Sequence, residues 1–115
     1  MGIFNRKKKS NGPDYSSIDS NEKAIELFEK GELEKIHLMP LTFGGQDIPM
    51  NTLYGPPHAN IFKNRFDTSL EQFIIEGKNL HYNASPEYKG KSFIPSKLTI
   101  TVSGDISFKQ TIEIW

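Results

Sequence analysis

Cysteine is absent from this 115-residue chain. Its absence excludes a disulfide scaffold, a thiolate metal site and a cysteine nucleophile. The sequence also lacks an apolar run long enough to cross a membrane or to form the core of a signal peptide. We therefore expect a cytoplasmic protein with no membrane partner. Aromatic residues nevertheless make up 11% of the sequence, and the length suits one domain with one modest core.

Net charge is absent as well, because 14 Lys and Arg residues balance 14 Asp and Glu residues. The basic residues are unevenly placed, since Arg6 and Lys7–Lys9 all lie in the first nine positions. The rest of the chain then carries ten basic and fourteen acidic side chains and is mildly acidic. We expect residues 1–18 to form a disordered basic tail and residues 19–115 to form a single α+β domain.

Two segments carry helical signals. Ser20 can cap a helix over residues 20–30, and Gly31 can end it in the left-handed conformation. A second helix is expected over residues 57–76, because proline is well tolerated in the first turn and the apolar residues recur at helical spacing. These apolar residues are Ala59, Phe62, Phe66, Leu70, Phe73 and Ile74.

Alternation of apolar and polar residues predicts the strands. They are expected at 33–39, 51–54, 80–84, 97–103 and 106–115. The last two should form a C-terminal hairpin, because Ser103–Asp105 reads as a turn. We expect an α+β fold in which two helices cover one face of an antiparallel sheet of four to five strands. The expected core residues are Ile25, Phe28, Leu38, Phe62, Phe66, Leu70, Phe73, Leu98, Ile100, Val102, Ile112 and Ile114.

No segment has the spacing of a known catalytic or metal site. His37, His58 and His81 do not pair at the spacing of zinc ligands. Residues 85–92 approach the pattern of a phosphate-binding loop, but Ser85 replaces its first glycine and a predicted strand follows in place of a helix. We expect no catalytic residue, no metal and no cofactor.

Two surfaces are candidates for binding a partner. Glu22, Glu26 and Glu29 share one face of the first predicted helix, where they favour a basic partner. The glycine-containing loop over residues 41–57 is long for a compact domain, and such loops are often functional. It supplies the further candidate contacts Gln46, Asp47 and Tyr54.

Two other classes of function stay open at this stage. A small hydrolase could use His37 with the Asp47 loop, and a closed pocket in which His37 meets an acid would favour it. A nucleic-acid-binding module could use the basic tail with Lys89, Lys91 and Lys97, in which case its binding would fall steeply with salt.

Four phrases of the sequence resemble a known group of proteins. They are Leu38–Gly45, Asn51–Tyr54, Pro86–Ser96 and Ile112–Trp115. Together they are similar to small cytoplasmic bacterial proteins found beside polymorphic toxins and regarded as immunity proteins. The resemblance covers residues 33–115. The group usually has valine between tyrosine and proline, where this chain has Gly55 between Tyr54 and Pro56. This difference predicts a shortened or distorted second strand.

The resemblance implies a non-enzymatic binding protein. Such a protein would neutralise a cognate bacterial toxin by direct protein–protein contact and needs no cofactor. We expect a monomer or a weak dimer, and pairing through an exposed sheet edge is left open. An acidic docking face on the first helix would suit a basic toxin.

Overall fold

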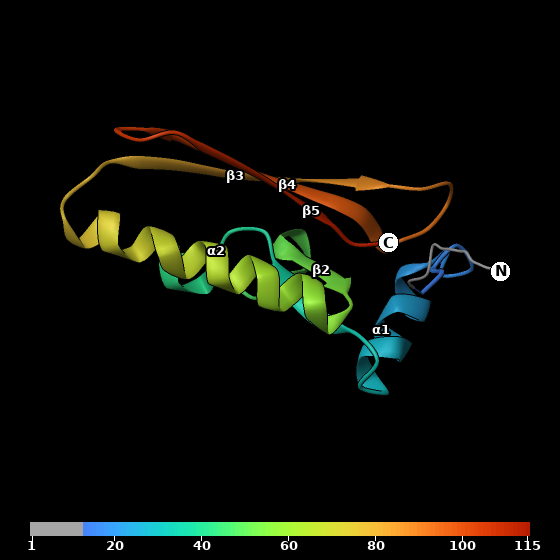
Figure 1. Cartoon of the computed structure of the whole chain (residues 1–115). Coiled ribbons are helices and arrows are strands. Elements are labelled where there is room, and N and C mark those ends of the chain that lie inside the picture. The colour runs from blue at the N-terminus through green and yellow to red at the C-terminus, as the bar shows by residue number, and fades with distance from the viewer. Residues whose placement is uncertain (1–12) are drawn as a thin grey trace, which may run out of the picture.

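The computed structural model describes residues 13–115 and has an α+β fold with two helices and two antiparallel sheets (Figure 1). Residues 1–12, which include the basic cluster of the expected tail, lie outside the described part. The elements in chain order are α1 (Asn21–Glu29), β1 (Glu34–His37), the short 3-10 helices η1 (Leu41–Phe43) and η2 (Pro49–Asn51), β2 (Thr52–Gly55), α2 (Pro57–Ile75), β3 (Leu80–Tyr88), β4 (Pro95–Gly104) and β5 (Phe108–Glu113).

The five strands do not form the single sheet that we expected. β1 pairs only with β2, from Glu34 opposite Gly55 to His37 opposite Thr52, while β4 lies between β3 and β5 in a separate sheet. Proline limits the smaller sheet, because Pro40 follows β1 and Pro56 follows β2, and proline lacks the N–H that a ladder needs. The expected C-terminal hairpin is confirmed, since β4 and β5 pair from Lys97 to Val102.

Gly55 does not shorten β2, contrary to the expectation from the sequence. The strand continues through Gly55, which is buried opposite Glu34. A Cβ atom on this residue would lie 2.8 Å from Cδ1 of Ile36. The missing side chain therefore lets the end of β2 approach the buried Ile36.

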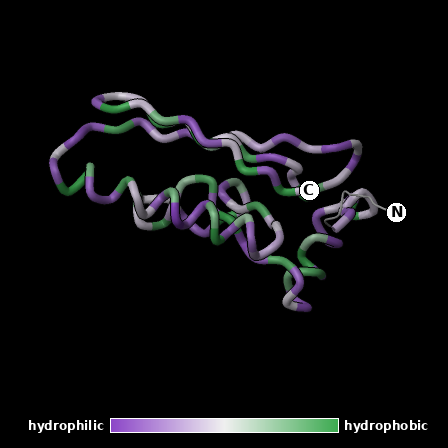
Figure 2. The backbone as a smooth tube through the Cα atoms, viewed as in Figure 1, coloured by the Kyte–Doolittle hydropathy of each residue, from purple (hydrophilic) through white to green (hydrophobic). Residues whose placement is uncertain are grey.

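Both expected helices are confirmed in place and type. Ser20 caps α1, because its hydroxyl oxygen accepts a hydrogen bond from the backbone N–H of Lys23 at 3.2 Å. Gly31 and Gly77 adopt positive φ angles just beyond α1 and α2, as helix-ending glycines do. Figure 2 shows hydrophobic and hydrophilic residues alternating around the turns of α2, which lies along one face of the larger sheet.

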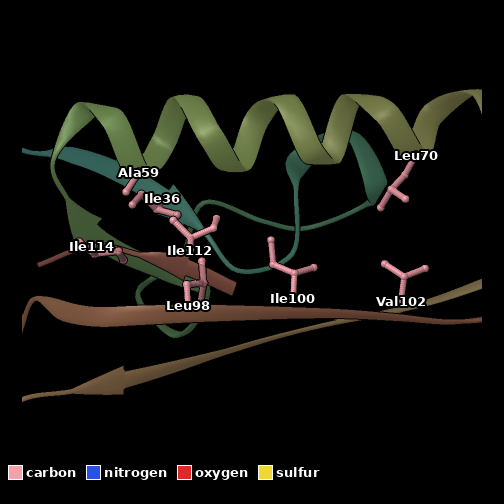
Figure 3. Close-up of a cluster of buried hydrophobic side chains, with 8 residues drawn as sticks. All are labelled: Ile36, Ala59, Leu70, Leu98, Ile100, Val102, Ile112 and Ile114. Atoms are coloured by element: carbon pink, nitrogen blue, oxygen red, sulfur yellow. The ribbon is translucent and has the colours of Figure 1, made fainter. Parts of the chain in front are cut away.

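The main core lies between α2 and this sheet, with Ile36 of β1 packed into the same cluster (Figure 3). Its buried members are Ile36, Ala59, Leu70, Leu98, Ile100, Val102, Ile112 and Ile114. Six of these come from strands and their flanks, and the strand alternation identified all of them as core residues except Ile36. Phe62 was wrongly expected in the core, and its side chain is 49% exposed.

The error at Phe62 follows from the phase of α2. The buried positions of this helix are Ala59, Lys63, Asp67 and Leu70, which recur at helical spacing. Two of these four residues are charged. A search that considers only apolar residues therefore assigns the buried face of the helix about one position away from where it lies. Phe62 then falls at the solvent edge of the face that packs on the sheet.

A second, smaller cluster joins α1 to the end of the larger sheet. Ala24, Leu33 and Ile94 are buried in it. Two residues of the expected tail also contribute, because Tyr15 and Ile18 pack against this cluster. The described contacts of the domain therefore begin before residue 19.

Candidate functional site

The loop between β1 and β2 is held in one conformation by Asn51. The side-chain oxygen of Asn51 accepts from the backbone N–H of Met39 at 2.8 Å. Its amide nitrogen donates to the carbonyl oxygens of Met39 at 3.0 Å and of Gln46 at 2.9 Å. One side chain therefore ties the start, the middle and the end of the loop together.

Two adjacent glycines allow the loop to turn this tightly. Gly44 has a φ angle of 97°, a left-handed conformation that few other residues adopt. A Cβ atom on Gly45 would lie only 2.0 Å from the carbonyl oxygen of Met39. The pair Gly44–Gly45 thus serves the geometry of the loop.

Large apolar side chains project from this braced loop. The exposed fractions are 88% for Met50, 43% for Ile48 and 49% for Leu41. Gln46 and Asp47, two of the candidate contacts, are also exposed between them. Loops usually expose polar residues, so a rigid loop with three exposed apolar side chains is typical of a binding surface.

The loop lies beside α1 and Tyr54. Asp47, Tyr54 and Ile25 of α1 are among the residues around a small cavity of about 140 Å³ between these elements. Tyr54 is half-buried, with its ring centroid 5.5 Å from that of Phe28. The structure therefore brings Asp47 and Tyr54 together with α1, as parts of one surface.

The acidic residues of α1 are all exposed. Asn21 and Ile25 face the cavity, and Phe28 contacts Tyr54. Each glutamate directly follows one of these three residues in the sequence, so the glutamates lie beside this face of the helix. None of the three glutamates forms an ion pair within residues 13–115. They consequently form an acidic margin next to the loop.

His37 does meet an acid, Asp47, but on an exposed loop and not in the closed pocket that would favour a hydrolase. Its Nε2 lies 3.0 Å from Oδ1 of Asp47, and Nζ of Lys35 lies 3.2 Å from the other carboxylate oxygen. The hydrogen bonds from His37 and then from Lys35 hold the pKa of Asp47 below its usual value. The side chain of Asp47 is half exposed, and no hydroxyl group in the described part is hydrogen-bonded to His37. The cluster links the loop to β1 and lacks an activated nucleophile of the triad type.

A buried polar cluster that the sequence analysis missed joins α2 to β3. Nζ of Lys63 lies 2.7 Å from Oδ2 of Asp67, and the hydroxyl group of Tyr82 donates to Oδ1 of Asp67 at 2.5 Å. The side chain of Lys63 is only 3% exposed. Burial lowers the pKa of Lys63 although Asp67 opposes this, and burial together with Asp67 raises the pKa of Tyr82.

The spacing of four residues between Lys63 and Asp67 was the signal that could have revealed this ion pair. Its burial depends on Tyr82, which is distant in sequence. An open cavity of about 330 Å³ lies beside the cluster, and His37 is among the residues that line it. The residues that line it are His37, Pro40, Leu41, Thr42, Asn60, Lys63, Asn64, Asp67, Thr68 and Glu71. No group of three or more residues suited to hold a metal ion occurs within residues 13–115.

The lysines considered for nucleic-acid binding are partly engaged within the protein. Nζ of Lys89 lies 4.7 Å from the ring centroid of Trp115, and Nζ of Lys97 lies 3.9 Å from Glu113. The segment that approaches a phosphate-binding loop runs from β3 toward β4, so no helix N-terminus follows it. This segment therefore lacks the geometry that binds phosphate.

No protein-family model matches the sequence, and a search of curated proteins gives no significant match. In the part of the chain that the structure describes, neither helix is long and apolar enough to cross a membrane.

We expect Asn51→Ala to loosen the loop. The substitution removes three hydrogen bonds and leaves the backbone N–H and carbonyl oxygen of Met39 without partners, which should cost about 2 kcal/mol of unfolding free energy. Urea unfolding measures the loss, and amide exchange at Met39 reports the loop directly. Asn83→Ala on the exposed face of β3 is the control. Equal stability of the two variants would contradict the bracing role of Asn51.

Stability should depend on the ionisation of Asp47. Because folding lowers the pKa of Asp47, its carboxylate stabilises the protein above the unfolded-state value of about 3.9 and loses this effect as the pH falls through the lowered folded-state value. The unfolding free energies of the wild type and Asp47→Asn should therefore differ at pH 6 and converge toward pH 2. In a Lys35→Met background, the difference in unfolding free energy caused by Asp47→Asn should be smaller at pH 6, because one partner of the carboxylate is gone. A difference that does not change with pH would argue against the contacts of Asp47 with His37 and Lys35.

The buried ion pair predicts a non-additive pair of substitutions. Lys63→Met leaves the buried carboxylate of Asp67 without its counter-charge and should cost about 3 kcal/mol. Lys63→Met combined with Asp67→Leu removes both charges and should recover most of that loss. Chemical denaturation of the wild type, Lys63→Met, Asp67→Leu and the double variant measures the coupling, and simple addition of the two single effects would contradict it.

Proposed function

We propose that the protein is a cytoplasmic, non-enzymatic immunity protein that neutralises a cognate bacterial toxin by direct contact. The braced loop between β1 and β2 carries this proposal. Three hydrogen bonds from Asn51 hold it, and it still exposes Ile48 and Met50 to solvent. The resemblance of residues 33–115 to immunity-type proteins supports the same function.

A rigid apolar loop suits a protein partner for two physical reasons. A loop that is already ordered loses little conformational entropy on binding, so more of the contact energy appears as affinity. Methionine is flexible and polarisable, which lets the side chain of Met50 adapt to an irregular partner surface. Met50 and Ile48 would form the apolar centre of the interface, with polar residues around them.

The acidic margin on α1 favours a basic partner. Glu22, Glu26 and Glu29 are exposed, adjacent to the loop and without ion-pair partners in the described part of the chain. Charges of this kind mainly speed association and exclude wrong partners, and salt weakens their effect. Gln46, Asp47 and Tyr54 would contribute contacts between the acidic margin and the apolar centre.

A small hydrolase remains the second candidate, on one observation. His37 contacts Asp47 and also lines the open cavity beside Lys63 and Asp67. Activity against a hydrolysable substrate that is lost in His37→Ala and retained in Met50→Asp would favour the hydrolase.

The first experiment captures the partner and then tests the surface. Tagged protein is used to isolate a partner from native cells, and the affinity of the purified pair is measured by calorimetry. Met50→Asp places a charge at the apolar centre and should weaken binding about tenfold or more, equivalent to at least ~1.4 kcal/mol. Ile75→Asp is a matched control, since Ile75 is 77% exposed at the far end of α2.

The acidic margin is tested by kinetics. Reversal of Glu22, Glu26 and Glu29 to lysine should slow association at low salt, with a smaller effect at high salt. Inhibition of the captured toxin by the wild type, and its loss in Met50→Asp, completes the test. The proposal fails if Met50→Asp and Ile75→Asp bind and inhibit equally well.

A further inference from the structure

Neither edge of the larger sheet has a strand partner within residues 13–115. β4 lies in the middle, β3 forms one edge and β5 forms the other (Figure 1). β3 has features that discourage further pairing, because it contains Pro86 and its register is irregular between Glu87 and Tyr88. β5 contains neither proline nor a bulge. Its edge is therefore the one suited to pair with another strand.

The register shows which backbone groups of β5 point outward. The N–H of Ile114 donates to the carbonyl oxygen of Ser96 at 2.7 Å, so these residues form a hydrogen-bonding pair. Such pairs alternate along an antiparallel ladder, and the next ones are Ile112, Gln110 and Phe108 with their partners in β4. The residues between them have their N–H and C=O groups on the free edge. These residues are Lys109, Thr111 and Glu113.

One observed hydrogen bond agrees with this assignment. The side-chain amide of Gln110 donates to the carbonyl oxygen of Thr111 at 3.1 Å. That oxygen is occupied by the side chain of its neighbour, as expected for a carbonyl group that does not face β4. A second strand could replace this local bond by a backbone ladder.

The side chains on this edge are complementary to a second copy of themselves. Lys109, Thr111 and Glu113 all lie on the exposed face of β5. If two β5 strands pair antiparallel with Thr111 opposite Thr111, each Lys109 lies opposite Glu113 of the second copy. Opposite charges across an antiparallel pair stabilise it, and like charges destabilise it.

Other registers that also bring the outward backbone groups of the two strands together do not place Lys109 opposite Glu113. Centring the pair on Lys109 places two lysines opposite each other, and centring it on Glu113 places two glutamates together. Intermediate registers leave the charges without opposite partners. The register centred on Thr111 also brings the 42% exposed Phe108 beside Ile114 of the second copy, on the apolar face of the sheet.

We propose that two copies of the chain associate through β5, antiparallel about a two-fold axis at Thr111, to form a continuous six-stranded sheet. The contact is a single pair of short strands with exposed ion pairs, which contribute little individually. The dimer is therefore weak and forms at high protein concentration. This proposal is independent of the toxin-binding function, because it uses β5 and neither the braced loop nor α1.

Disulfide cross-linking tests the register. The full chain has no cysteine, so Thr111→Cys introduces a single thiol. In the proposed pair the two Cα atoms would lie about 5.5 Å apart, within the range that a disulfide spans. Thr101→Cys, exposed on the central strand β4, is the matched control. We expect covalent dimers of Thr111→Cys to form faster by tenfold or more under mild oxidation. Equal rates would overturn the proposed register.

A charge exchange tests the ion pairs. Lys109→Glu and Glu113→Lys each create two like-charge contacts across the two-fold axis and should abolish the concentration-dependent dimer in sedimentation velocity. The double variant carrying both substitutions restores opposite charges and should restore the dimer. Unfolding curves of all variants check the fold, since Glu113 also lies near Lys97 of its own chain. A wild type that stays monomeric at every accessible concentration, or single variants that dimerise as well as it does, would overturn the proposal.

Discussion

The packing of α2 against the larger sheet holds the two sheets in one molecule. Ala59 and Leu70 of this helix meet the buried row of Leu98, Ile100 and Val102 on β4. Ile36 of the smaller sheet enters the same cluster. Side-chain packing therefore holds β1 and β2 in place, since no backbone hydrogen bonds of a ladder join them to β3–β5. The position of the loop between β1 and β2 depends on that packing.

Two polar side-chain networks add specificity to this apolar contact. The cluster of Lys63, Asp67 and Tyr82 fixes the rotation of α2 relative to β3, because turning the helix would bury unpaired charge. The amide of Asn51 does the same for the loop, because the backbone groups of Met39 lose their partners if the loop moves. Each network replaces water with well-oriented hydrogen bonds.

The two proposed surfaces occupy different parts of the molecule. The toxin-binding surface combines the loop over residues 41–51 with the acidic face of α1, whereas the self-association surface is the free edge of β5. Both present groups that no other strand or core residue covers: the exposed side chain of Met50 in one case, and the backbone groups of β5 that point away from β4 in the other. Because no element is shared, one copy could bind a partner and pair with a second copy.

Local patterns in the sequence were sufficient for the helices and for most of the core. Ser20 and Gly31 mark the ends of α1, and the alternation through Leu98, Ile100 and Val102 identifies β4, because these signals act over a few residues. The sequence also placed Gln46 and Asp47 on a long loop. It did not reveal that Asn51 braces this loop, since that depends on the backbone of Met39 twelve residues away.

The arrangement of the strands and the phase of α2 were decided by tertiary structure alone. The division into two sheets depends on which strand edges meet in space. The periodicity of a sequence shows which face of a strand is buried, but it does not show which strands pair with it. Phe62 and Lys63 show the same limit, because the apolar residue is exposed and the charged one is buried. Burial of Lys63 is tolerable only because Asp67 and Tyr82 lie beside it, and Tyr82 comes from another element of the fold.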